Sequence, residues 1–296
     1  MTGRPLPGSR TSFQRSAIKI APVSGALGAE VAGVDLRSLS DDDVAQVRSA
    51  VHEYEVVFLR GVDLTEQEQL TVGGRFGRVN LFPLARLRGA TEPTPMVITD
   101  GPDGPSADHW HTDVTWTAEP PDYALLQALV VPERGGDTLW ASMTAAYDAL
   151  SPVMQELLVE LEVVHDNESF IAGLLAGGVE QPGIDKMADA LRAQYPPVVH
   201  PLVRVHPDTG RRLLFLGGGF MRRIQGMTDT ESQALLRLLA HHIDDPRFHC
   251  RWRWQAGDLA IWDERSTNHR SAGDHFPQPR SIRRIEVGGA RPRGVR

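Results

Sequence analysis

Alternating apolar and polar residues dominate the chain from Pro95 onward and predict strands. Nine segments combine β-branched or aromatic residues with Gly, Pro or Asp at their ends. They cover residues 95–100, 122–131, 137–142, 161–165, 198–206, 211–216, 248–254, 258–263 and 281–287. This pattern is typical of a predominantly antiparallel sheet.

Apolar residues at helical spacing predict helices before and between these strands. Ser40 with Asp43, and Thr65 with Glu68, have the spacing of capping boxes at helix starts. Ser151 can cap a third helix with Pro152 in its first turn. The predicted helices cover residues 40–55, 65–77, 151–161, 184–194 and 228–243, and residues 17–36 and 56–60 read as short strands.

These elements predict a mainly β fold with added helices, a double-stranded β-helix or jelly roll. Residues 1–15 are rich in Gly, Pro, Ser and Arg and are predicted to be a flexible lead-in. Residues 16–296 show no repeat, low-complexity tract or linker, which favours a single domain. The glycine-containing segment 166–183 is predicted to be irregular and is a candidate lid.

Composition narrows the class of partner to a small molecule. The formal net charge is −7 with both signs interspersed, so neither nucleic acid nor an anionic membrane is expected as a partner. No apolar stretch is long enough to span a bilayer, and there is one cysteine, Cys250. We therefore predict a soluble, cytoplasmic protein.

The stretch "DHWHTDVTW" carries the candidate chemistry. His111 and Asp113 are separated by one residue and would share a side of an extended strand. With His269 as a third ligand, they would form the two-histidine, one-carboxylate set associated with non-haem Fe(II) oxygenases. Spacing alone leaves the alternative of ordinary packed or surface residues open, because the chain has 11 histidines.

Several separated motifs resemble one known family in their order along the chain. They are "WHTDVTW", "GGDTLWASMTAAYDALSP", "RWRWQAGDLAIWDERSTNH" and "PQPRSIRR". Together they resemble the taurine catabolism dioxygenase (TauD/TfdA) family from about residue 17 to the end. The stretches "SGALGAEVAGVDL", "HPLVRVHPDTGRRLLF" and "IQGMTDTES" further resemble its phenoxypropionate (aryloxyalkanoate) dioxygenase branch.

The resemblance implies an enzyme that uses Fe(II), 2-oxoglutarate and O₂. His111, Asp113 and His269 would hold the iron, and Thr138 and Arg280 would bind the far carboxylate of 2-oxoglutarate. The expected reaction hydroxylates an unactivated C–H bond and releases succinate and CO₂. The family also implies a homo-oligomer, a dimer or tetramer.

Arg284 matches the family arginine that binds the anionic group of the prime substrate. Because strand side chains alternate, Arg280 and Arg284 would face one cavity. Phe82, Ala85 and Ala107 stand where taurine enzymes have polar side chains, so taurine is expected to be a poor substrate. The candidate pocket wall comprises Asn80, Leu81, Phe82, Val114 and Phe220.

The expected substrate is a small anionic organic molecule, a carboxylate, sulfonate or sulfate ester. Oxidation beside a heteroatom could then cleave the adjacent C–O or C–S bond. A biosynthetic tailoring hydroxylase of an amino-acid-like substrate is the main alternative. A Zn-dependent hydrolase with the same ligands and an inactive jelly-roll binding protein are further alternatives.

Overall fold

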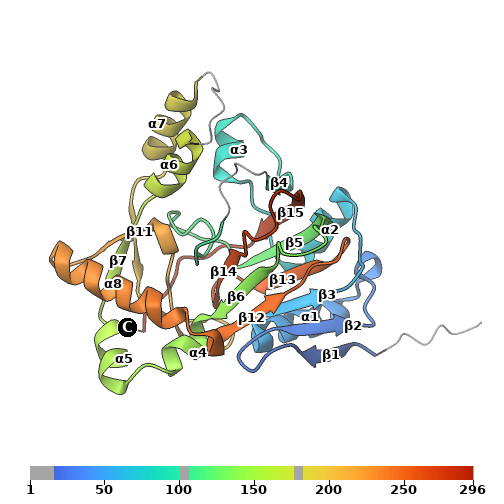
Figure 1. Cartoon of the computed structure of the whole chain (residues 1–296), viewed down its shortest axis with the longest axis horizontal. Helices are drawn as coiled ribbons and strands as arrows, with labels where there is room; N and C mark the ends of the chain where they lie inside the picture. Colours follow the sequence, from blue (N-terminus) through green and yellow to red (C-terminus); the bar gives the residue numbers. More distant parts are fainter. Residues whose placement is uncertain (1–16, 101–106, 177–182, 296) are drawn as a thin grey trace, which may run out of the picture.

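A seven-stranded sheet is the framework of the structure (Figure 1). The computed structural model describes residues 17–100, 107–176 and 183–295, so the predicted lead-in lies outside the described residues. The strand order is β1-β2-β3-β13-β5-β15-β4, antiparallel except between β2 and β3. The strands are β1 (Lys19–Pro22), β2 (Ala29–Ala32), β3 (Val56–Leu59), β13 (Leu259–Asp263), β5 (Tyr123–Val130), β15 (Arg280–Val287) and β4 (Met96–Asp100).

A smaller sheet packs against the large one and completes the jelly roll. Its strands are β12 (His249–Trp252), β6 (Thr138–Ser142) and β14 (Thr267–Ser271), with β6 in the middle. Aromatic side chains fill the space between the sheets: Phe58 stacks on Trp252 at 4.0 Å between ring centroids, and Trp140 meets Trp262 edge to face at 5.7 Å. The predicted mainly β jelly roll is confirmed.

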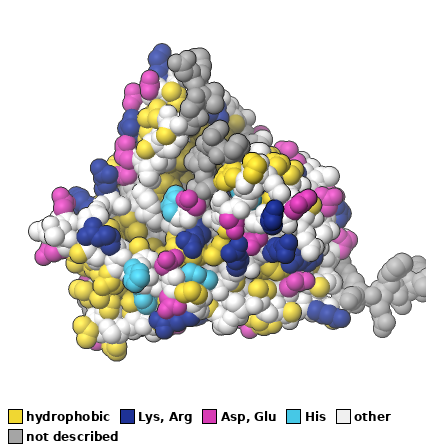
Figure 2. Space-filling model, viewed as in Figure 1, with side chains coloured by type: hydrophobic (Ala, Val, Ile, Leu, Met, Phe, Trp, Pro, Cys, Tyr) yellow, Lys and Arg dark blue, Asp and Glu magenta, His cyan; other side chains and the backbone are white. Residues whose placement is uncertain are grey.

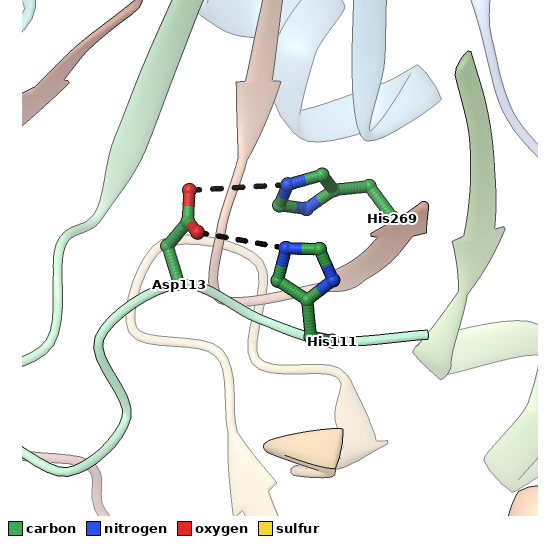
Figure 3. Close-up of side chains that lie close together, drawn as sticks. All are labelled: His111, Asp113 and His269. Atoms are coloured by element: carbon green, nitrogen blue, oxygen red, sulfur yellow. Dashed lines mark ion pairs between the residues drawn. The ribbon is translucent and has the colours of Figure 1, made fainter. Parts of the chain in front are cut away.

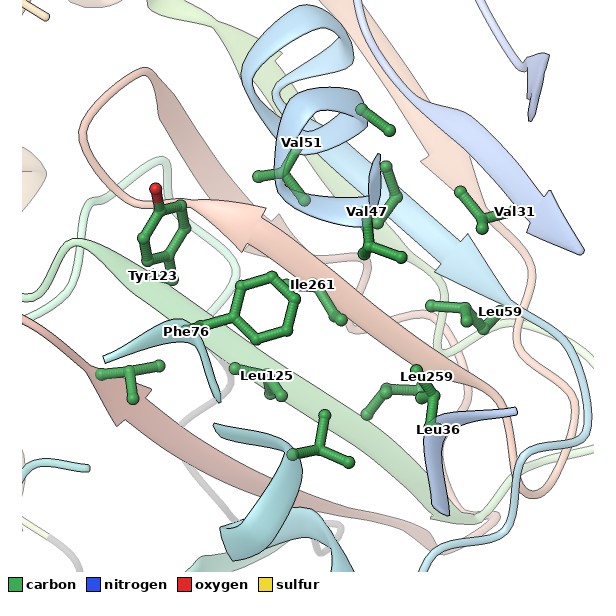
Figure 4. Close-up of a cluster of buried hydrophobic side chains, with 14 of the residues drawn as sticks. Val31, Leu36, Val47, Val51, Leu59, Phe76, Tyr123, Leu125, Leu259 and Ile261 are labelled. Carbon is green, nitrogen blue, oxygen red and sulfur yellow. The ribbon is translucent and has the colours of Figure 1, made fainter. Parts of the chain in front are cut away.

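Two helices cover the outer face of the large sheet. They are α1 (Asp41–Tyr54) and α2 (Glu66–Phe76), and both predicted capping boxes are present at their starts. Apolar residues of both helices pack on alternate residues of β3, β5 and β13 (Figure 4). Since alternate strand residues face opposite sides, the other set, which includes Leu126 and Trp262, faces the smaller sheet.

The remaining elements extend the jelly roll. One group comprises α4 (Met143–Asp148), α5 (Pro152–Leu158), β7 (Glu162–His165), β8 (Val198–Pro201), β9 (Val203–Val205), β10 (Arg212–Leu214), β11 (Met221–Ile224) and α8 (Asp229–Ile243). A second group comprises α3 (Pro83–Leu87), α6 (Glu168–Ala176) and α7 (Ile184–Gln194), drawn at the top of Figure 1. Short 3₁₀ turns are η1 (Leu36–Ser38), η2 (Gly218–Phe220) and η3 (Pro246–Phe248). No described helix has the length and apolar character needed to cross a bilayer.

Some local expectations need correction. The predicted strand 198–206 is divided into β8 and β9, which lie in different sheets, with Leu202 between them. The expected irregular segment contains α6, and residues 177–182 lie outside the described residues. His111 forms only an isolated bridge and Asp113 lies in a turn, so the expected extended strand is wrong there.

Candidate active site

Three side chains from two distant segments converge beside the smaller sheet (Figure 3). His111 and His269 exchange backbone hydrogen bonds of 3.1 and 2.8 Å across an antiparallel bridge. Asp113 turns back toward both rings, with its Oδ1 3.7 Å from His111 Nε2 and its Oδ2 3.8 Å from His269 Nε2. All the ligand atoms lie within 4.8 Å of one another. The sequence-predicted triad is therefore assembled.

The turn that aims Asp113 at the histidines is tightly packed. Val114, a β-branched residue, has a φ of +52°, which costs backbone energy and is found mainly where surrounding structure enforces it. Behind the turn, Gly218 has a φ of +60°, and a Cβ there would lie 2.3 Å from the Trp110 carbonyl oxygen. Glycine is therefore required at position 218 by the close approach of the Trp110 and His111 backbone.

The protonation states of the triad suit a divalent metal. Burial lowers the pKa of both histidines, which keeps the imidazoles neutral. Burial alone would raise the pKa of Asp113, but the positive charge of Arg284 holds it below its ordinary value. His111 Nδ1 lies 2.9 Å from the His109 carbonyl oxygen, so it donates there and leaves Nε2 free as a ligand.

The residues present therefore fit an iron site. Two neutral imidazoles and one carboxylate are the ligand set of Fe(II) oxygenases, with coordination positions left for other ligands. His269 Nδ1 has no hydrogen-bond partner among the described residues, so its ring also presents Nε2 to the site. When bound, the iron with 2-oxoglutarate and O₂ supplies the oxidising chemistry.

Arg280, at the start of β15, lines a small cavity together with both histidines of the triad. Its Nη2 donates to Thr138 Oγ1 at 3.0 Å and its Nε to the Gly136 carbonyl at 2.8 Å, so the two residues expected to act together are in contact. Its Nη1 pairs with Asp100 Oδ2 at 2.8 Å. Arg280, Arg284, Thr138, His111 and His269 all line this cavity of about 90 Å³, so the two arginines face one cavity, as alternation along the strand predicts.

Arg284 lies between carboxylates. Its Nη1 donates to Asp113 Oδ2 at 2.6 Å, and its Nη2 is 3.1 Å from Glu286 Oε1. Burial would lower the pKa of Arg284, but Asp113 and Glu286 raise it above its ordinary value, so the guanidinium stays charged. Glu264 accepts a hydrogen bond from the Asp113 amide at 3.2 Å, and burial together with the Asp113 charge raises the pKa of Glu264.

A second, larger cavity of about 750 Å³ begins beside this ion pair. Asn80, Leu81 and Val114 of the predicted pocket wall line it, together with Glu286. Phe82 and Phe220 are not among the described residues of its lining and pack instead against the apolar cluster around Val114 and Trp116. Three of the five predicted wall residues therefore line the cavity, and the two phenylalanines belong to the apolar cluster.

Sequence reasoning missed three polar residues at the site: Asp100, Glu264 and Glu286. The signal for Glu286 was present, since it lies two residues beyond Arg284 in the same predicted strand. No such signal existed for Asp100, because its contact with Arg280 depends on the register of β4 against β15. Glu264 directly follows the predicted strand 258–263, a position that by itself does not indicate a contact with the Asp113 amide.

Comparison with known proteins identifies the family. Residues 19–285 match the model described as "Taurine catabolism dioxygenase TauD, TfdA family". The chain is 36% identical to an "Alpha-ketoglutarate-dependent sulfate ester dioxygenase" of Pseudomonas putida, over 94% of this chain and 92% of the relative. It is 34% identical to an "Alkylsulfatase" of Acinetobacter baylyi, over 92% and 85%.

A phenoxypropionate dioxygenase of Delftia acidovorans is more distant, with 30% identity over 93% of this chain and 96% of the relative. Among solved structures, a taurine dioxygenase from Burkholderia xenovorans superposes with a TM-score of 0.77 and 33% identity, covering 95% and 94% of the two chains. The expected family is confirmed, while the two sulfate-directed relatives are more similar than this phenoxypropionate enzyme. The chain therefore belongs to the TauD/TfdA family of Fe(II)- and 2-oxoglutarate-dependent dioxygenases.

Proposed function

We propose that this dioxygenase hydroxylates a small organic anion whose charged group is held by Arg284. The observation that carries the proposal is the placement of two arginines on one face of β15, both lining the small cavity beside the triad histidines. Arg280 contacts Thr138 at one end of the site, and Arg284 contacts Asp113 beside the large cavity. Two cationic anchors suit a dianionic cosubstrate and an anionic prime substrate.

In this arrangement Arg280 and Thr138 bind the far carboxylate of 2-oxoglutarate. Arginine offers a planar pair of donors that matches a carboxylate, and the Thr138 hydroxyl adds a third. Both side chains are buried, so the contact excludes water. Buried Trp262 and Leu126 line the same cavity and limit solvent access to it.

Arg284 orients the prime substrate so that a carbon near its anionic group faces the metal. Hydroxylation of a carbon that bears a sulfate oxygen gives a product that collapses to a carbonyl compound and sulfate. The names of the Pseudomonas and Acinetobacter relatives favour this sulfate-ester outcome over cleavage of an aryloxyalkanoate. We therefore rank alkyl sulfates first and aryloxy acids second as substrates.

The large cavity favours a substrate bulkier than taurine. Leu81, Pro83 and Val114 give part of its wall an apolar surface. Phe82 and Ala85, which stand where taurine enzymes have polar groups, lie in and beside α3 and offer no charged or hydroxyl side chain. Taurine would leave its ammonium group without these partners, so we expect little taurine turnover.

Separate titrations of two variants test the roles of the arginines. A charge-assisted bidentate contact is worth about 1.5–3 kcal/mol, which corresponds to roughly a ten- to hundredfold change in affinity. Arg284→Ala should raise the KM for hexyl sulfate by this factor and leave that for 2-oxoglutarate nearly unchanged. Arg280→Ala should do the reverse. If both replacements weaken the same ligand, the assignment is wrong.

We further propose a reducing compartment such as the cytoplasm and a homo-oligomeric assembly. The buried, unpaired thiol of Cys250 supports the first proposal. The family resemblance supports the second.

A further inference from the structure

Glu286, on the inward face of β15, has no part in the binding of iron, 2-oxoglutarate or the substrate anion as proposed so far. Alternation along the strand places Arg280, Ile282, Arg284 and Glu286 on the face toward the interior. Ile285 faces the opposite way, into the core beneath α2. Glu286 lines the large cavity and contacts Arg284, which lines the small one, so it lies next to the position proposed for the substrate anion.

Glu286 is buried but poorly compensated. Its side chain is 7% exposed, and its Oε1 lies 3.1 Å from Arg284 Nη2 without a hydrogen-bond partner among the described residues. Burial raises the pKa of Glu286 to about 7 despite the opposing charge of Arg284. A buried carboxylate normally has several donors, so this group has capacity for another.

The negative charges around Arg284 indicate that the additional donor to Glu286 comes from the substrate. Arg284 already faces two carboxylates, Asp113 and Glu286. A substrate anion on Arg284 would bring a third negative group beside Glu286. A hydrogen-bond donor or positive charge on the substrate itself would relieve this repulsion and satisfy the free capacity of Glu286.

We propose that Glu286 is a specificity-determining residue that binds a hydroxyl or ammonium group on the carbon next to the anionic group of the prime substrate. The proposal rests on the proposed function, because it requires the anion to bind Arg284. It predicts that the enzyme discriminates between acids that differ only at that carbon. Unsubstituted anions, alkyl sulfates among them, bind against the charge of Glu286, so an anion with an adjacent donor should bind more tightly than they do.

Three acids with one carbon skeleton provide the probe: phenylalanine, phenyllactate and 3-phenylpropionate, which carry ammonium, hydroxyl and hydrogen at this carbon. Their dissociation constants are measured by calorimetry on the protein loaded with Mn(II) and 2-oxoglutarate. Unit charges about 5 Å apart in a protein interior interact strongly enough to change affinity by at least about tenfold. In Glu286→Gln, the preference for phenylalanine over 3-phenylpropionate should therefore fall at least about tenfold, with phenyllactate intermediate.

Glu119→Gln is the matched control, since Glu119 lines the same cavity but is exposed to solvent. It should leave the preference unchanged. Glu286→Thr, a smaller neutral replacement, should shift the preference as Glu286→Gln does, and thermal unfolding identifies any variant that is not folded. The proposal is overturned if the preference is unchanged in both Glu286 variants, if Glu119→Gln shifts it equally, or if none of the three acids binds.

Arg284→Ala separates failure of this proposal from failure of the proposed function. Binding of all three acids should weaken in Arg284→Ala. If it does not, the anion is held elsewhere and the proposed function is at fault. If it does, and the Glu286 variants keep the wild-type preference, only the role of Glu286 is refuted.

Discussion

At the scale of single residues, the site is held by a chain of contacts in which each group fixes the next. The His109 carbonyl sets the orientation of the His111 ring, and the positive φ of Val114 follows the turn that brings Asp113 back to the histidines. Arg284 then donates to Oδ2 of Asp113, the oxygen that faces His269. A displacement of about 1 Å at such a site can cost much of its activity.

Gly218→Ala should weaken metal binding by about tenfold or more, which is the usual effect of changing a residue that supports a metal ligand. The added Cβ would meet the Trp110 carbonyl at 2.3 Å and His111 Cβ at 3.1 Å. Gly226→Ala is the control, because Gly226 also has a positive φ, +77°, but has nothing within 4 Å of its Cβ position. Metal titration by calorimetry compares the two. Equal metal affinity in both variants would show that the absence of a side chain at Gly218 does not matter for the position of His111.

Asp100→Asn should strengthen 2-oxoglutarate binding by roughly tenfold, since it removes a carboxylate that competes for Arg280. Calorimetry on the Mn(II)-loaded protein measures the change. Asp137→Asn is the control, because Asp137 is buried nearby but pairs with Arg251 at 2.6 Å. Weaker 2-oxoglutarate binding in Asp100→Asn would show instead that Asp100 orients Arg280 for the cosubstrate.

At the scale of elements, prediction succeeded where a segment's own pattern determines its structure. The capping boxes at Ser40 and Thr65 give α1 and α2 within a residue or two, and β5, β6 and β13 follow from alternation between turn residues. β14 was not predicted, because "TNHRS" is polar and becomes a strand through its pairing with β6. The triad could be predicted from the family motifs, but the contacts of Asp100 and Glu286 depend on strand register, which one sequence does not reveal.

The contact between α2 and β15 gives a test with adjacent glycines. A Cβ at Gly73 would lie 2.4 Å from Ile285 Cδ1, whereas a Cβ at Gly74 meets nothing within 4 Å. Gly73→Ala should lower the free energy of unfolding by about 1–3 kcal/mol through overpacking. Gly74→Ala should raise it by up to about 1 kcal/mol through helix propensity. Urea unfolding measures both, and an equal effect of the two replacements would rule out close packing of α2 on β15.

At the scale of the whole molecule, the jelly roll supplies rigid strands and the added elements enclose the site. β14 and β15 carry His269 and both arginines, while α3, α6 and α7 pack around Val114 and Trp116 on the side of the large cavity. Charges of both signs are interspersed on the face drawn in Figure 2. His165 of β7 and His200 of β8 are buried and both contact Thr115, two residues beyond Asp113.

His165 should make stability depend on pH. It is fully buried, and burial, with the charges of His200 and Arg204, lowers its pKa to about 3. Below about pH 6.5 the unfolded chain binds a proton that the folded protein does not, so stability is full above pH 6.5 and is lost as the pH falls toward 3. In His165→Gln the loss per pH unit should be smaller than in the wild type by roughly 1.4 kcal/mol.

Urea unfolding between pH 4.5 and 7.5 gives this difference in slope. His109→Gln is the control, because the His109 side chain is 63% exposed, and it should keep the wild-type slope. A wild-type slope in His165→Gln would mean that His165 is protonated in the folded state.

The most direct test of the central claim is succinate formation from 2-oxoglutarate by protein reconstituted with Fe(II) or Zn(II), in air and with hexyl sulfate present. We expect succinate only with Fe(II) and O₂ together. Alanine at His111, Asp113 or His269 should abolish it. His109→Ala should retain it, because His109 contacts the His111 ring through its backbone carbonyl. Turnover with Zn(II) but not Fe(II), or equal loss in His109→Ala and the triad variants, would contradict the assignment of this site as an Fe(II) and 2-oxoglutarate centre.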